Sequence, residues 1–130
     1  MKRPYPKKLQ PLLLSPMTRK KMDMLQWTKF NEKTLSQFKL LGTSGTARAI
    51  MANSGLNVEG LGHGPDGGDV YIAHAILERK IDKLIFFIDV KEPHGHEHDI
   101  QMLIRNAVLA NIPFALNRKT ADFLITSDLL

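Results

Sequence analysis

A loop with four glycines in eight residues contains the strongest candidate for an anion site in this chain. It spans residues 62–69 and leads into an apolar segment with helical periodicity that begins at Val70. A glycine-rich loop at a helix entrance exposes backbone N–H groups, and the helix dipole adds partial positive charge, so we expect an anion to bind there. Asp69 closes the loop, and two roles are open for it: a helix N-cap, or a base held against a ligand whose negative charge the amides carry.

A second loop supplies hydroxyl groups. Thr43, Ser44 and Thr46 offer three hydroxyls around Gly45, just before a predicted helix. This arrangement suits a phosphate, although serine and threonine are also ordinary residues at a helix start. The loop lacks the lysine and the spacing of a P-loop and does not match Gly-x-Gly-x-x-Gly. Neither standard nucleotide-binding loop is therefore predicted.

Three alternating histidines form a third candidate site, in the loop that follows the fourth predicted strand. They are His94, His96 and His98, and Asp99 follows them directly. Such a cluster could bind a transition metal weakly, but tight binding needs further ligands and a supporting hydrogen-bonded shell. The alternative is that one histidine transfers a proton while Asp99 orients it or caps the next helix.

Composition limits the classes of protein to consider. A chain of 130 residues with 43% hydrophobic residues can bury one core, so we expect one domain over residues 1–130. The absence of cysteine excludes disulfides, thiolate zinc sites and a cysteine nucleophile. The first 29 residues carry eight basic residues against one acid, including a basic arm at about residues 1–8. Because no aromatic residues alternate with these charges and no nucleic-acid-binding motif occurs, we predict no nucleic-acid partner.

The start of the chain also bears on localisation. The apolar run after the basic arm is only Leu12-Leu13-Leu14 and ends before Pro16. Such a run is too short to export or anchor a protein. We therefore expect a cytoplasmic protein with no membrane partner.

Short apolar runs alternate with amphipathic segments along the chain. The predicted strands are 9–15, 38–41, 56–61, 83–89 and 113–116, and the predicted helices are about 18–35, 47–54, 69–79, 99–110 and 120–127. The expected inner face of the first helix is formed by Met22, Leu25, Trp27, Phe30 and Leu35. The alternation predicts a three-layer, Rossmann-like α/β fold with a five-stranded, mostly parallel sheet and helices on both faces. All three candidate loops follow strands, and ligands bind at that edge of such a sheet.

Five motifs resemble those of the methylglyoxal synthase family, in order and at matching spacing over about residues 9–127. They are Gly64-Pro65-Asp66-Gly67-Gly68-Asp69, Ile85-Phe86-Phe87-Ile88-Asp89, His96-Glu97-His98-Asp99-Ile100, Asn111-Ile112-Pro113 and Thr120-Ala121-Asp122. The resemblance implies the methylglyoxal-synthase-like fold and a lyase that converts dihydroxyacetone phosphate to methylglyoxal and inorganic phosphate. It further implies that the enzyme uses no metal or organic cofactor and forms a homohexamer.

The resemblance also implies roles for individual residues. The family's base falls on Asp69, the histidine that acts on the substrate oxygens falls on His96, and the supporting aspartates fall on Asp89 and Asp99. The expected catalytic set is thus Asp69, His96 and Asp99. The implied phosphate contacts are Lys20, Thr43, Ser44, Gly45, Thr46, His63 and Gly64. Arg105 matches a family arginine near the subunit boundary.

Several positions depart from the family pattern. Pro16 and Met17 stand where the family has a histidine and an aspartate, and His63 stands in place of a serine. One glycine and one hydroxyl have exchanged places in residues 43–47, two prolines around the catalytic histidine are Gly95 and His98, and a family tail arginine has no counterpart before Leu130. These departures keep a second function open: a catalytically weakened module that binds a phosphorylated metabolite for regulation. The retained catalytic set favours the enzyme, and the altered loops favour the binding module.

Overall fold

Five strands form one sheet that is parallel throughout. The computed structural model describes residues 10–61, 69–91 and 97–127. The strands are β1 (Pro11–Leu14), β2 (Lys39–Gly42), β3 (Val58–Gly60), β4 (Lys83–Ile85) and β5 (Phe114–Ala115), in the order β3-β2-β1-β4-β5. Every neighbouring pair is parallel. The predicted α/β fold with a parallel sheet is confirmed.

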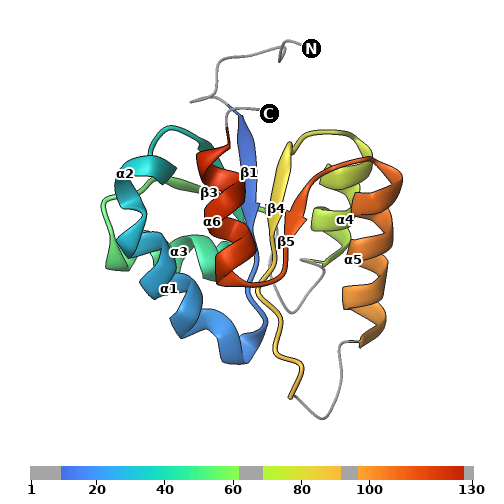
Figure 1. Ribbon diagram of the computed structural model, residues 1–130, viewed down its shortest axis with the longest axis horizontal. Helices are drawn as coiled ribbons and strands as arrows, with labels where there is room; N and C mark the ends of the chain where they lie inside the picture. The colour runs from blue at the N-terminus through green and yellow to red at the C-terminus, as the bar shows by residue number, and fades with distance from the viewer. Residues whose placement is uncertain (1–9, 62–68, 92–96, 128–130) are drawn as a thin grey trace.

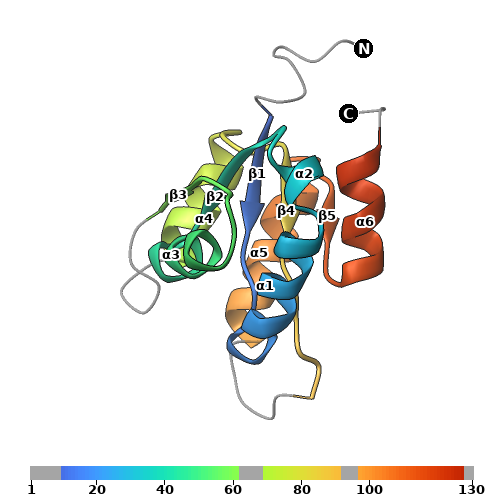
Figure 2. The same ribbon diagram turned by 90° about the vertical axis from the view of Figure 1, so that its left-hand side faces the viewer.

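Helices cover both faces of this sheet, as Figures 1 and 2 show. The helical segments are η2 (Thr18–Lys20), α1 (Lys21–Phe30), α2 (Glu32–Leu35), α3 (Ser44–Asn53), α4 (Asp69–Leu77), α5 (Glu97–Leu109) and α6 (Arg118–Thr126). Helices α1, α2, α3 and α6 share one buried core, and α4 and α5 share the other. Among the described residues, no helix is long and apolar enough to cross a membrane.

The central strand β1 contributes to both cores. Leu12 and Leu14 are fully buried under α1, α2, α3 and α6, whereas Leu13 is fully buried under α4 and α5. Successive side chains of a strand point to opposite faces, so a strand covered on both sides needs a continuous apolar run. This requirement explains the sequence Pro11-Leu12-Leu13-Leu14.

The first predicted helix covers the right residues, 18–35, but the prediction is wrong in its continuity and in part of its inner face. The chain forms η2, α1 and α2 instead of one helix, with a break at Asn31. Both the backbone N–H and the side-chain amide of Asn31 donate to the Trp27 carbonyl, at 3.0 and 2.9 Å. Such local side-chain competition is typical of a helix end. The buried face of α1 is formed by Met24, Trp27 and Thr28, so Met22 and Phe30 are 65% and 85% exposed.

Most other element boundaries differ from the prediction by one or two residues, and two of the larger differences lie at the carboxyl edge of the sheet. Helix α3 begins at Ser44 rather than at residue 47, so Ser44, Gly45 and Thr46 form its first turn. Strand β4 ends at Ile85, although the next residues keep bonding to the end of β5 and to the residue after it. The Phe86 N–H donates to the Ala115 carbonyl at 2.8 Å, and the Ile88 N–H donates to the Leu116 carbonyl at 3.3 Å.

Candidate active site

The candidate site lies at the carboxyl edge of the sheet, where β1 is flanked by β2 and β4. The chain crosses from β1 to β2 and β3 on one side and to β4 and β5 on the other, so a crevice between connections is expected at this point. The segments after β1 and β4 continue side by side beyond the sheet. The N–H groups of Ser15 and Met17 donate to the carbonyls of Ile85 and Phe87, at 2.9 and 2.8 Å.

Met17 and Asp89 meet at this crevice. The backbone N–H of Asp89 donates to the Met17 thioether, with 3.1 Å between nitrogen and Sδ. Met17 is 8% exposed and belongs to the core under α4 and α5. A thioether is a weak acceptor with no titratable proton, so Met17 can position Asp89 but cannot exchange a proton with a ligand.

The Asp89 carboxylate is held from two sides. Its Oδ1 accepts a hydrogen bond from the Lys91 N–H at 3.0 Å, and its Oδ2 lies 3.9 Å from Arg19 Nη1. The side chain of Asp89 is 12% exposed, whereas that of Arg19 is 61% exposed. Sequence reasoning missed Arg19, because the two residues are far apart in the chain and no local spacing connects them.

The hydroxyl loop forms the start of α3 at the same edge. Thr43 is the N-cap residue in an extended conformation, but its side chain makes no capping hydrogen bond to the helix. The Thr43 hydroxyl instead donates to the Thr46 hydroxyl at 3.2 Å. A Cβ added at Gly45 would meet nothing within 4 Å, so the backbone there is open to approach. The first turn of α3 therefore has the geometry of an anion site, and phosphate binding by this loop stays a prediction.

The ends of β2 and β3 are packed too closely for larger residues. A Cβ at Gly42 would lie 3.1 Å from the Leu14 carbonyl, and a Cβ at Gly60 would lie 3.3 Å from the Ser44 Cα and Oγ. The Leu61 N–H also donates to the Gly42 carbonyl at 2.6 Å. This packing holds the first turn of α3 beside the exit of β3, from which the chain leads to Asp69.

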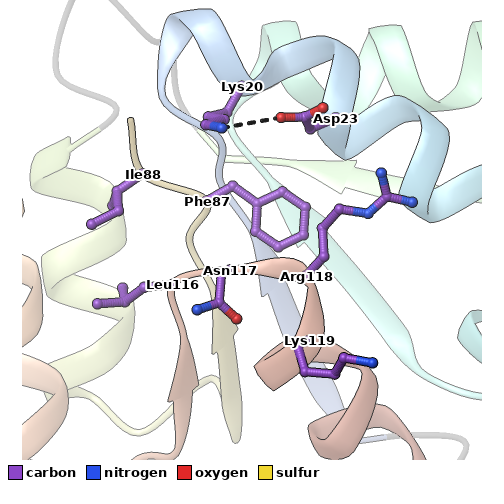
Figure 3. Close-up of a pocket in the computed structure, with 8 residues that line it drawn as sticks. All are labelled: Lys20, Asp23, Phe87, Ile88, Leu116, Asn117, Arg118 and Lys119. Carbon is purple, nitrogen blue, oxygen red and sulfur yellow. Dashed lines mark ion pairs between the residues drawn. The ribbon is translucent and has the colours of Figure 1, made fainter. Parts of the chain in front are cut away.

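Lys20 ends η2 at the same edge, with its ammonium 3.3 Å from Asp23 Oδ2. Its side chain is 35% exposed. Lys20 lines a pocket of about 380 Å³ between the starts of α1 and α6, shown in Figure 3.

The structure describes only some of the remaining predicted site residues. Asp69 is the first residue of α4, and Asp99 is in the first turn of α5. Both helices follow parallel strands and pack in the same core, so both begin near the carboxyl edge of the sheet. Arg105 is exposed further along α5. The other predicted residues, His63, Gly64 and His96, lie outside the described residues, as do His94 and the basic arm at residues 1–8.

No metal site is found within residues 10–61, 69–91 and 97–127, where no group of three His, Cys, Asp or Glu side chains is arranged to hold an ion. Two of the three alternating histidines fall outside these ranges. A role for the histidine cluster in proton transfer thus remains a prediction.

Comparison with known proteins identifies relatives over most of the chain. A family model for the MGS-like domain matches residues 23–116. Methylglyoxal synthase of Proteus mirabilis (strain HI4320) is 44% identical over 109 residues, which cover 84% of this chain and 72% of that protein. Methylglyoxal synthase of Hahella chejuensis (strain KCTC 2396) is 40% identical over 124 residues, which cover 95% of this chain and 81% of that protein.

The fold is also similar to a solved structure. The crystal structure of methylglyoxal synthase from Elizabethkingia anophelis NUHP1 superposes with a TM-score of 0.86 at 32% sequence identity. The match covers 93% of this chain and 80% of that one. The similarity therefore includes the strands and helices that form the carboxyl edge described above.

Proposed function

The chain belongs to the methylglyoxal synthase family of phosphate-eliminating lyases, and we propose that it converts dihydroxyacetone phosphate to methylglyoxal and inorganic phosphate. The observation that carries this proposal is the first turn of α3, which lacks a side-chain cap and lies beside the crevice between β1 and β4. Such a turn is suited to hold the phosphate that leaves.

We assign proton removal to Asp69. In the proposed reaction, the Asp69 carboxylate takes a proton from the hydroxymethyl carbon beside the substrate carbonyl, and an enediolate forms. This assignment is supported by the position of Asp69 at the start of α4, on the edge of the sheet where α3 also begins. His96 is proposed to donate a hydrogen bond or a proton to the enediolate oxygens, with Asp99 as its supporting carboxylate.

Phosphate leaves in the second half of the proposed reaction. The enediolate electrons expel phosphate as the carbon–oxygen bond breaks, and the bridging oxygen stays with the phosphate. The remaining enol takes up a proton at carbon and becomes methylglyoxal, so the atoms balance without an oxidant or reductant. The amides and hydroxyls of the α3 turn and the Lys20 ammonium would stabilise the charge that grows on the phosphate.

The test is direct. Purified protein is incubated with dihydroxyacetone phosphate, and methylglyoxal and inorganic phosphate are measured in parallel. We expect equal amounts of both products, with neither formed by Asp69→Asn. Phosphate release without methylglyoxal would point to hydrolysis and would contradict the proposal.

A second function is supported by one specific observation. Met17 occupies the position beside Asp89 and has no group that can transfer a proton. A site altered in this way fits a regulatory module that binds a phosphorylated metabolite without converting it. Saturable phosphate binding with no product from dihydroxyacetone phosphate would favour this alternative.

Assembly and location are parts of the same proposal. We propose a homohexamer built from one domain per chain, because large apolar side chains on the described surface need cover. Examples are Phe30, Leu109 and Phe123, which are 85%, 75% and 69% exposed. We place the enzyme in the cytoplasm, because charged triose phosphates do not cross membranes unaided. Sedimentation measurements would test the assembly.

A further inference from the structure

We propose that the pocket between the starts of α1 and α6 is a second anion site, which binds a small organic phosphate separately from the first turn of α3. We call it the α1–α6 pocket. Its volume is about 380 Å³, which is enough for a small phosphomonoester. It is formed by segments that follow β1, β4 and β5, whereas the first turn of α3 follows β2 on the other side of β1.

The polar side chains of the α1–α6 pocket favour a dianion. Lys20, Arg118 and Lys119 provide three positive charges, and Asp23 provides the single negative one. Asp23 is already paired with Lys20. Neither Arg118 nor Lys119 forms an ion pair with any other residue that the structure describes. The surplus of two positive charges matches a phosphomonoester, which carries close to two negative charges at neutral pH.

One more polar group can orient the ligand. The Asn117 carbonyl oxygen caps α6 by accepting a hydrogen bond from the Thr120 N–H at 2.9 Å. Asn117 lines the α1–α6 pocket, and its side-chain NH2 group can still donate to a ligand there.

The floor of the pocket favours a ligand with an apolar body. Ile88 and Leu116, which are partly exposed, line one side of it, and the Phe87 ring, which is only 2% exposed, lies beneath them towards the core (Figure 3). An inorganic anion would leave this apolar surface in contact with water. An organic phosphate would cover it while its phosphate group contacts Arg118 and Lys119.

The fold supplies a reporter for this site. Trp27 is the only tryptophan of the chain, and its ring packs edge-on against Phe87 with 5.7 Å between centroids. Phe87 lines the α1–α6 pocket, so a ligand bound there should change the environment of this buried ring pair and with it the Trp27 fluorescence. Phenyl phosphate is a suitable probe because it combines a flat apolar body with a phosphate, and phenol is the matched control without charge.

The test compares phenyl phosphate titrations of the wild type and Arg118→Gln/Lys119→Gln. We expect a saturable change in Trp27 fluorescence for the wild type, no such change with phenol, and an apparent Kd raised at least about tenfold in the double variant. Lys33→Gln/Lys80→Gln removes the same charge from exposed positions elsewhere and should leave the Kd within about twofold. Thr43→Val, which alters the α3 turn, should also leave this Kd unchanged.

Three outcomes would overturn the proposal. An unchanged Kd in Arg118→Gln/Lys119→Gln would show that these cations do not hold the anion. An equal loss of affinity in Lys33→Gln/Lys80→Gln would mean that only the net charge of the protein matters. A loss of affinity in Thr43→Val would mean that the Trp27 fluorescence reports binding at the α3 turn. Matching melting temperatures among the variants would show that all of them are folded.

The α1–α6 pocket also gives a route to regulation, and this step rests on the proposed function. Lys20 lines the pocket and is the proposed phosphate contact, so an anion in the pocket should draw Lys20 away from the substrate. We expect phenyl phosphate to inhibit methylglyoxal formation in the wild type and not in Arg118→Gln/Lys119→Gln, whose uninhibited rate should stay normal. A chain without turnover would still give the fluorescence titration, so failure of the function and failure of the site are distinguishable.

Discussion

The backbone N–H of Asp89 donates a hydrogen bond to the thioether sulfur of Met17, with 3.1 Å between the two atoms. This contact joins the segments after β1 and β4 at the point where the sheet reverses its connections. Met17 is buried, so the position beside Asp89 is apolar in this protein. The Asp89 carboxylate at this position is paired with Arg19.

Replacement of Met17 tests how strongly the fold depends on this apolar contact. Met17→Asp should destabilise the protein by about 1–3 kcal/mol, because it places a polar group in an 8% exposed position within the core under α4 and α5. Met17→Leu nearly conserves volume and should cost less than about 1.5 kcal/mol. Chemical denaturation of both variants measures the difference. Equal losses would mean that volume, not polarity, decides the effect.

A hydrogen bond between α1 and α6 gives a second stability prediction. Trp27 is 1% exposed, and its indole N–H donates to Asp122 Oδ1 at 2.9 Å. Trp27→Phe removes the donor and leaves space beside Phe87, so we expect a loss of about 2 kcal/mol in the free energy of unfolding. Asp122→Asn keeps an acceptor and should cost clearly less. If both variants were equally destabilised, the charge of Asp122 would matter more than the hydrogen bond.

The order of strands and helices could be predicted from the sequence because short apolar runs mark the strands, above all the central ones. The run Leu12-Leu13-Leu14 is one example, since its side chains enter both cores. The break at Asn31 could not be predicted, because it depends on one side-chain amide that competes for the Trp27 carbonyl. The apolar periodicity of the sequence continues through Asn31, so it predicts one unbroken helix. It also predicts that Phe30 is on the buried face, whereas Phe30 is exposed.

The loops that form the candidate site could be selected from the sequence, but the contacts between their side chains could not. Residues 43–46 were selected for their hydroxyls and amides, and the structure places them at the carboxyl edge of the sheet as the first turn of α3 and its N-cap. The contacts of Asp89 with Met17 and Arg19 join residues far apart in sequence, which only the folded chain brings together. Asp122 was noted as part of a family motif, but its bond to Trp27 required the structure.

Asp69→Asn tests the assignment of the base. Asparagine has a similar size and retains some capping ability, but it cannot accept the proton, so methylglyoxal formation should fall by about 10²-fold or more. Circular dichroism should show an unchanged fold. Near-normal turnover in the folded variant would assign Asp69 to helix capping and leave the base unidentified.

Separate replacement of the histidines distinguishes proton transfer from metal binding. If His96 acts alone, His96→Ala should lose most activity, whereas His94→Ala and His98→Ala should each retain most of it. Treatment with a chelator should then leave the rate unchanged. Activity that is lost with chelator and restored by one divalent ion would instead indicate a metal site.

Lys20→Met tests the phosphate contact. The change removes the ammonium and keeps an unbranched side chain, so inorganic phosphate should bind more weakly by about 1.5–3 kcal/mol, the usual strength of a hydrogen bond to a charged group. The titration is best made in the Arg118→Gln/Lys119→Gln background, so that the α1–α6 pocket contributes little. Asp23→Asn is the matched control, because it removes the carboxylate 3.3 Å from the ammonium and should strengthen phosphate binding. Unchanged phosphate affinity in Lys20→Met would place the site away from η2.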